Sequence, residues 1–180
     1  MKHLPLDDAL RMFNKLFSAA RHDMFKLEVL QDYSIVDDSP SLTAWLAGDM
    51  QKARELGRQS EDIIAYRKKC LASPAAITRV HAVKEPYTAY LDWEIEVCYK
   101  DSLLAYNAES ISLVNHDAIT DTDIPAGDFW IFDNEHVLQW EYQNGSGKLM
   151  GGYLWDTSAG DSIAYFQKLR DKLLNMATPL

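Results

Sequence analysis

Cysteine is scarce in this sequence, and the scarcity limits the kinds of protein it can be. The 180 residues contain two cysteines, Cys70 and Cys98. A disulfide framework or a zinc site needs more cysteines than this, or histidines at ligand spacing. We therefore expect both thiols to be reduced and to pack as small apolar side chains.

Long hydrophobic runs are also missing. A membrane-spanning helix needs roughly 20 apolar residues, and no stretch of the chain approaches that length. The first residues, MKHLPLDDALRMF, lack the continuous apolar segment of a signal peptide. The sequence therefore predicts a cytoplasmic protein that does not enter a membrane.

Basic residues are outnumbered by acidic ones. The chain has 18 Lys and Arg against 27 Asp and Glu, which gives a net charge of -9. Such a chain is repelled by a phosphate backbone, and it has no basic stripe with interleaved aromatic residues. We expect no direct contact with nucleic acid, whereas a basic protein partner is compatible with this charge.

Catalytic, metal-binding and phosphate-binding motifs are absent as well. No G-x-S-x-G occurs, and the histidines never recur at the spacing that places two ligands on one helix face. The acidic segment that includes His116, Asp117, Asp121 and Asp123 lacks the central glycine and the final glutamate of a calcium-binding loop. We predict no metal site and no cofactor.

The composition itself is typical of a soluble globular domain. Hydrophobic residues make up 47% of the chain and charged residues 25%, and 180 residues are enough to bury a hydrophobic core. We expect a single domain over residues 1–180. Its helical N-terminal part (1–74) contains one strand, and its second part (75–180) contains the sheet.

The N-terminal part shows mainly helical periodicity. Apolar residues recur every three or four positions after Pro5, which predicts a first helix to about Ala20. Residues 24–33 alternate between apolar and polar side chains and are predicted to form a strand. A short helix is expected over 41–50, ending near Gly48, and one polar helix over 51–72.

The second part begins with a strand and a helix. Residues 77–84 alternate, with Arg79 and His81 on one face. Pro86 fits the first position of a helix that runs to about Tyr106. A strand is expected at 109–114.

The remaining segments predict the rest of the sheet. DFWIFD is apolar on both faces and is expected to be a central strand. HVLQWEYQ and KLMGGYLWD flank the turn residues Asn144–Gly147 and are therefore predicted to be antiparallel. A final helix over 158–176 carries an apolar stripe. The prediction is an α+β fold with N-terminal helices, a mainly antiparallel sheet and a C-terminal helix packed on it.

One carboxylate stands out because it shares a helix face with apolar residues. In the predicted helix after Pro86, Glu94 lies in a stripe that includes Tyr90 and Leu91. A buried carboxylate must find a cation, stay in contact with water, or take up a proton. Arg79, on the preceding strand, is the nearest cation along the chain that could face it, while Glu85 and Glu109 flank the helix.

Two interpretations of this neighbourhood remain open. In the first, a small polar pocket uses Arg79 to hold a ligand and Glu94 as acid, base or hydrogen-bond acceptor. The residues predicted to bind the ligand are Arg79, Glu85, Tyr90, Trp93, Glu94 and Glu28. In the second, Arg79 and a carboxylate form a buried ion pair that fixes the helix on the sheet.

Five segments in order resemble one known family. They are FKLEVLQDY, WLAGD, RVHAVKEPYTAYLDWE, NAESI and DFWIFDNEHV. Their order and spacing resemble the actinobacterial family known as domain of unknown function 6879, over nearly the whole chain. The family usually has Ala-Gly-Glu where this chain has Asn107–Glu109, and Phe-Arg-Leu-Glu where it has Phe25–Glu28. The lysine in the second segment keeps the charge of arginine but not its bidentate geometry.

The resemblance implies no established activity. Members of the family are often encoded beside helix-turn-helix regulators, which implies a regulatory protein partner. Our first hypothesis is therefore a non-enzymatic regulatory or adaptor protein that binds such a partner and has room for a small ligand. The alternative is a small hydrolase or transferase, with Glu94, Glu109 or Glu28 as general base and Arg79 as an anion clamp. A homo-oligomer built through the apolar strands of the sheet is a third arrangement.

Overall fold

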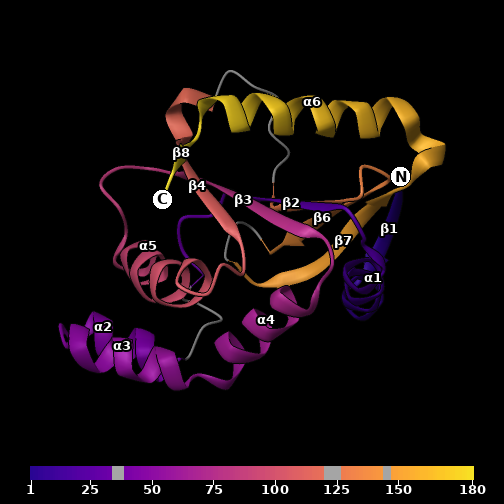
Figure 1. The fold of residues 1–180 in the computed structure, drawn as a ribbon. Coiled ribbons are helices and arrows are strands. Elements are labelled where there is room, and N and C mark those ends of the chain that lie inside the picture. The colour runs from indigo at the N-terminus through magenta and orange to yellow at the C-terminus, as the bar shows by residue number, and fades with distance from the viewer. Residues whose placement is uncertain (34–38, 120–126, 144–146) are drawn as a thin grey trace.

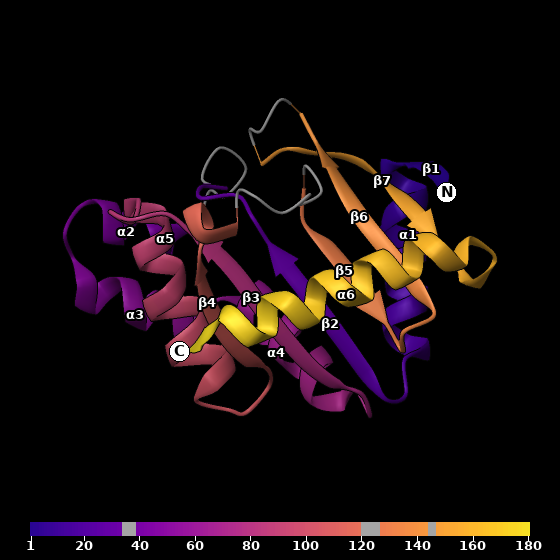
Figure 2. The same ribbon diagram turned by 90° about the horizontal axis from the view of Figure 1, so that it is seen from above.

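The helix α6 (Gly160–Met176) lies across one face of an eight-stranded sheet, and the other α-helices lie on the opposite side (Figure 1). Viewed from above, α6 crosses the strands diagonally (Figure 2). The structure is a computed structural model that describes residues 1–33, 39–119, 127–143 and 147–180. The predicted turn at 144–147 falls largely outside these residues, as do Asp121 and Asp123 of the acidic segment.

The sheet has the strand order β1-β7-β6-β5-β2-β3-β4-β8. From one edge to the other these are β1 (Lys2–Pro5), β7 (Leu149–Trp155), β6 (His136–Tyr142), β5 (Phe129–Phe132), β2 (Asp23–Glu28), β3 (Ala76–Val83), β4 (Ser110–Asn115) and β8 (Thr178–Pro179). The pairs β2–β3 and β3–β4 are parallel, and the other pairs are antiparallel. The predicted α+β fold with a mainly antiparallel sheet and a C-terminal helix is confirmed.

The sequence did not predict the two edge strands. β1 has four residues and β8 has two, too few for a periodic pattern to emerge. The N-terminal part therefore contains two strands, not one. The parallel pairs arise because helices connect β2 to β3 and β3 to β4, and a parallel pair needs such a crossover.

Strand β5 lies in the middle of the sheet, and its four residues are all buried. Phe129 and Ile131 belong to the core beneath α6. Trp130 and Phe132 face the other way and contact Phe13 of α1 (Leu6–Ala19), with ring centroids 5.3 and 6.1 Å apart. The prediction of a central strand that is apolar on both faces is confirmed.

The helical segment between β2 and β3 differs from the prediction. It contains α2 (Pro40–Leu46), α3 (Met50–Gln59) and α4 (Glu61–Ala72). Gly48, with φ of 83°, separates α2 from α3 as expected. The single helix predicted over 51–72 is wrong, because Ser60 has an extended backbone and its hydroxyl caps α4 by accepting from the Ile63 amide.

The helix after β3 also begins later than predicted. The Glu85–Pro86 peptide is cis, and α5 (Ala89–Trp93) begins after Thr88, whose hydroxyl accepts from the Leu91 amide at 3.1 Å. Pro86 is therefore not the first helical residue, because the cap lies at Thr88. From Glu94 the helix continues as the π-helix η1 (Glu94–Leu104), in which backbone bonds join residues five apart.

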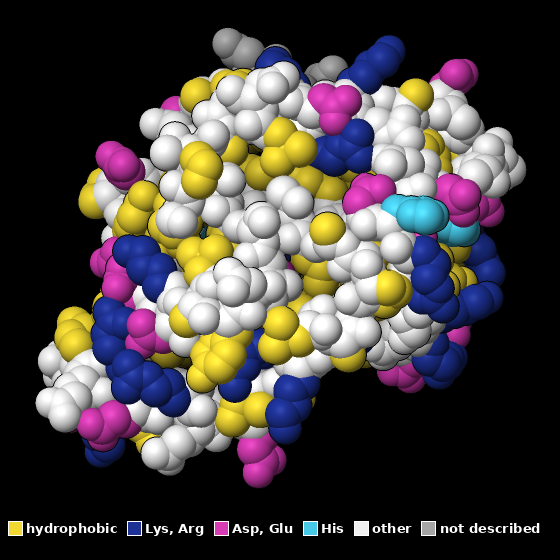
Figure 3. Space-filling view, in the orientation of Figure 1, with side chains coloured by type: hydrophobic (Ala, Val, Ile, Leu, Met, Phe, Trp, Pro, Cys, Tyr) yellow, Lys and Arg dark blue, Asp and Glu magenta, His cyan; other side chains and the backbone are white. Residues whose placement is uncertain are grey.

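The surface seen in Figure 3 carries charges of both signs. Over the face formed by α3 and α4, Lys and Arg side chains are interleaved with Asp and Glu side chains. None of the helices in the described ranges has the length and apolar character that crossing a bilayer requires.

The position of α6 can be tested with two adjacent leucines. Leu173 is fully buried against the sheet, whereas Leu174 is 39% exposed. Truncation of a buried leucine to alanine costs about 2–5 kcal/mol of unfolding free energy, so we expect this loss for Leu173→Ala and less than about 1 kcal/mol for Leu174→Ala. Urea unfolding measures both. Equal losses would contradict the docking of α6.

Candidate functional site

Polar side chains of β2 and β3 converge on the face of the sheet opposite α6. The two strands are parallel, with Lys26 beside Arg79 and Glu28 beside His81. Their neighbours in sequence, such as Leu27 and Val80, point into the core under α6. The alternation of each strand therefore places four polar side chains on the face that η1 covers.

Arg79 is the centre of this cluster. It is 4% exposed. Its Nε and Nη2 donate to the two carboxylate oxygens of Glu109 at 2.8 and 3.0 Å, and its Nη1 donates to Glu28 at 2.9 Å. Burial raises the pKa of Glu28, but Arg79 and Lys26 outweigh it and hold that pKa well below its usual range.

Of the two interpretations, the buried ion pair of Arg79 with a carboxylate is present, but its partners are Glu28 and Glu109 and not Glu94. Glu28 lies on the strand beside Arg79, and Glu109 precedes β4 on the other side. These two carboxylates take the Nε, Nη1 and Nη2 donors of Arg79, and the Tyr66 hydroxyl lies 3.2 Å from Nη2. Glu94 thus has no cation paired with it among the described residues.

Glu94 is 8% exposed, and its Oε2 is fully buried without a hydrogen-bond partner among the described residues. The nearest basic group is Nδ1 of His81, 3.6 Å from that oxygen. Burial, followed by the charge of Glu28, raises the pKa of Glu94 to about 8. At pH 7 this side chain is therefore mostly a neutral carboxylic acid.

The π-helix brings a further hydroxyl to the cluster. Tyr99 lies 2.6 Å from Oε2 of Glu28 and 2.9 Å from Nδ1 of His81. Its single proton can serve only one of these acceptors at a time. Sequence reasoning missed Tyr99 because α-helical periodicity turns residue 99 away from the face of Glu94, whereas a π-helix brings residues five apart toward one face.

Asp128 is a second buried carboxylate that sequence reasoning missed. It directly precedes β5 and accepts hydrogen bonds from the Tyr33 hydroxyl at 2.6 Å, the Tyr142 hydroxyl at 2.7 Å and the Val29 amide at 2.8 Å. Burial, followed by the charge of Glu28, raises the pKa of Asp128. Its partners come from the segment after β2 and from β6, so no local pattern could have pointed to it.

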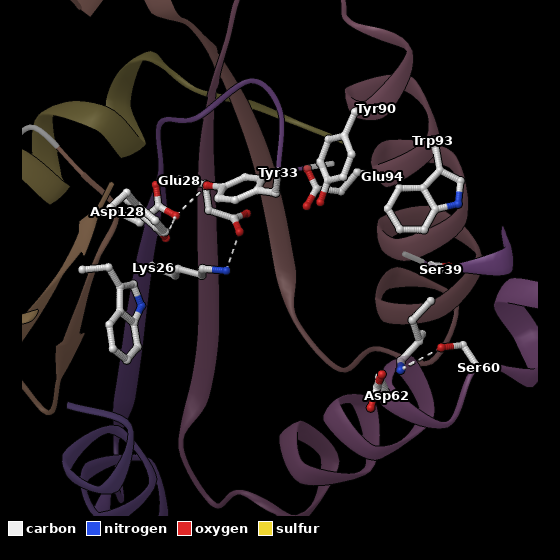
Figure 4. A pocket seen from close by; sticks show the side chains of 13 residues that line it. Lys26, Glu28, Tyr33, Ser39, Ser60, Asp62, Tyr90, Trp93, Glu94 and Asp128 are labelled. Atoms are coloured by element: carbon white, nitrogen blue, oxygen red, sulfur yellow. Dashed lines mark hydrogen bonds and ion pairs between the residues drawn. The ribbon is translucent and has the colours of Figure 1, made fainter. Parts of the chain in front are cut away.

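A pocket of about 470 Å³ opens beside these groups (Figure 4). Its charged lining residues are Lys26, Glu28, Asp62, Glu94 and Asp128, and its aromatic ones are Tyr33, Tyr90, Trp93, Trp140 and Tyr142. In Figure 4 the Glu94 carboxylate lies beside the Tyr90 ring, on the side that faces Tyr33. Lys26 is paired with Glu28.

The structure separates the predicted site residues into three groups. Glu28, Tyr90, Trp93 and Glu94 line the pocket. Arg79 and Glu109 are buried outside its lining. Glu85 is exposed and lines a different hollow with Tyr87 and Leu180. Within the residues that the structure describes, no three His, Cys, Asp or Glu side chains are placed to hold a metal ion.

A family model described as "Domain of unknown function (DUF6879)" matches residues 11–180. The chain belongs to the DUF6879 family. No curated protein shows significant similarity to this DUF6879 chain. Among solved structures, the archaeal chromatin protein TrmBL2, whose structure shows a mode of DNA binding, has a similar fold with a TM-score of 0.51 and 8% sequence identity. The match covers 97% of the DUF6879 chain and 50% of the TrmBL2 chain, so the chain spans about half of that protein's length.

Removal of the Arg79 charge should be strongly destabilising. Arg79→Met leaves Glu28 and Glu109 buried beside one fewer cation, and loss of one partner of a buried ion pair costs about 3–5 kcal/mol. Urea unfolding at pH 7 measures this loss. The control is Arg11→Met, since Arg11 forms an exposed pair with Asp8 and should contribute little. Equal stability of the two variants would contradict the central role of Arg79.

Proposed function

We propose that this DUF6879 chain is a non-enzymatic regulatory module that binds a small polar ligand in the pocket and acts through a protein partner. The observation that carries the proposal is that Oε2 of Glu94, a residue that lines the pocket, is buried without a hydrogen-bond partner among the described residues. A buried polar group without a partner costs about 1–3 kcal/mol. A ligand that hydrogen-bonds to Glu94 would remove this cost.

The other buried carboxylates at the pocket do have hydrogen-bond partners. Glu28 is bonded to Lys26, Arg79 and Tyr99, and Asp128 accepts from two tyrosine hydroxyls and an amide. Glu94 is therefore the group left to recognise a ligand. The aromatic residues around it supply the apolar surface that most small-molecule sites use.

The same geometry gives less support to the alternative, a hydrolase or transferase. In that hypothesis Arg79 is an anion clamp and Glu94, Glu109 or Glu28 is a general base; Glu28 is already hydrogen-bonded to Lys26, Arg79 and Tyr99. A general base must reach a substrate proton within hydrogen-bonding distance. Arg79 and Glu109 form a hydrogen-bonded ion pair outside the pocket lining, so neither is positioned to contact a ligand in the pocket.

For the partner we favour a DNA-binding regulator over DNA itself. The resemblance of the sequence implied a helix-turn-helix partner, and TrmBL2, which has a similar fold over half of its chain, binds DNA. The net charge of -9 does not suit a phosphate backbone, and the face in Figure 3 mixes both signs of charge. We propose that the partner carries the DNA contact and that both proteins are cytoplasmic, which suits a chain whose two cysteines form no disulfide.

The ligand-binding role can be tested by thermal unfolding against a library of charged, zwitterionic and neutral small molecules. A ligand at about 100 times its Kd stabilises a fold by about 2.7 kcal/mol, which is roughly 5–10 °C for a chain of this size. We expect such a shift for wild type and for Glu85→Gln, whose glutamate lies outside the pocket, and its loss in Glu94→Gln. Equal shifts in all three proteins would place the ligand elsewhere.

The proposed binding of a protein partner is tested separately by calorimetric titration with a helix-turn-helix regulator encoded beside this protein. Binding with a Kd below tens of micromolar is expected, and no heat of binding at about 50 µM would count against it.

A further inference from the structure

The carboxyl groups in and behind the pocket outnumber the cations beside them. Lys26 and Arg79 are paired with Glu28, and Arg79 also binds Glu109. Two cations thus match two carboxylates. Glu94 and Asp128 are left without an ion pair among the described residues, and the pocket lining also includes Asp62. The described pocket lining therefore has more carboxyl groups than cations, and a cation bound beside them would favour their ionised forms.

Aromatic rings form a continuous wall beside these carboxyl groups. The ring centroids of Tyr33 and Tyr90 are 5.8 Å apart, those of Tyr90 and Trp93 are 5.4 Å apart, and Tyr142 follows Tyr33 at 6.0 Å. All four side chains line the pocket. The faces of such rings attract cations, most strongly where water is excluded.

An anionic ligand would find little to hold it. Lys26 supplies the cation of the described pocket lining, and it is already paired with Glu28 and lies 5.5 Å from the Trp130 ring centroid. An anion would also be placed beside Glu94 and Asp128. A neutral ligand would gain hydrogen bonds but no charge attraction from the excess carboxyl groups.

We propose that the ligand of this pocket is a small organic cation, whose ammonium group lies against the Glu94 carboxylate with its substituents on the rings of Tyr33, Tyr90 and Trp93. This inference rests on the proposed ligand-binding role and adds the chemical class of the ligand. The volume of about 470 Å³ accommodates a molecule of this kind.

Binding of a cation should release the proton of Glu94. Burial and the charge of Glu28 raise the pKa of Glu94 to about 8, and a cation beside it favours the ionised form. The charged and titratable groups that face Glu94 are Glu28 and Lys26 from β2, Arg79 and His81 from β3, Tyr99 from η1, and Asp128 from the segment before β5. Burial lowers the pKa of His81, so its imidazole remains neutral at pH 7.

The sign of the pH dependence follows from this linkage. Only the ionised fraction of Glu94 binds the cation well, and this fraction rises about ninefold between pH 6 and pH 7 for a pKa of about 8. The apparent affinity for a cation should therefore rise by nearly tenfold over this interval and level off above pH 8. For a neutral ligand that accepts the Glu94 proton in a hydrogen bond, the affinity should instead fall above pH 8.

The experiment is a calorimetric titration of the full chain with choline and with ethylammonium, at pH 6, 7 and 8.5. The matched controls are 3,3-dimethylbutan-1-ol and ethanol, which have similar shapes but no charge. We expect each cation to bind at least tenfold more tightly than its neutral counterpart, with the rise in affinity between pH 6 and 7. Glu94→Gln should remove this rise and weaken cation binding at pH 8.5 at least tenfold, whereas Glu85→Gln should change neither.

Equal binding of the cations and their neutral counterparts to wild type would overturn the inference without any variant. A pH profile that is identical in wild type and Glu94→Gln would also overturn it. If the library yields neutral or anionic ligands whose binding depends on Glu94 while both cations fail, the ligand-binding role stands and the cation assignment falls. If the binding of no compound of any class depends on Glu94, both the ligand-binding role and the cation assignment are wrong.

Discussion

The fold around the site depends on the placement of one buried charge, the guanidinium of Arg79. It lies between Glu28 on one neighbouring strand and Glu109 beside the other, and three of its nitrogens donate to these carboxylates. A lysine could not make this bidentate contact. Because β2, β3 and β4 meet at Arg79, the interaction links the parallel part of the sheet. The Tyr66 hydroxyl brings α4 into the same network.

The pairing of Arg79 with Glu28 and Glu109 explains why the described pocket lining contains a carboxyl group without an ion pair. With its donors taken, Arg79 cannot also neutralise Glu94, which enters the same region from η1. Glu28, which Arg79 keeps ionised, is instead the charge that helps to raise the pKa of Glu94. A buried ion pair and a carboxyl group without an ion pair thus lie in the same cluster of described residues. The ion pair stabilises the sheet and leaves Glu94 at the pocket, and our proposal of a binding site rests on this arrangement.

The class of the fold and part of this site, Arg79 and Glu94, could be predicted from the sequence. The alternation in β2 and β3 was strong enough to place Arg79 on a face of its strand, and the apolar surroundings of Glu94 identified it as unusual. The partner of Arg79 could not be predicted, because it depends on which strands are adjacent, and the parallel crossovers that bring Glu28 and Glu109 beside it leave no local signal. Tyr99 was missed because an α-helical period does not describe a π-helix. Likewise Asp128 owes its environment to residues distant in sequence.

Because Arg79 is paired with Glu28 and Glu109, Glu94 remains buried and uncharged at neutral pH. The most direct test is a ¹³C NMR titration of the glutamate side-chain carboxyl groups, with the Glu94 signal assigned by its loss in Glu94→Gln. The structure predicts one glutamate that titrates with an apparent pKa of about 8 and that this signal is Glu94. A Glu94 carboxyl group that titrates near the ordinary glutamate value of 4.5 would contradict the account, because Glu94 would then be paired or solvated.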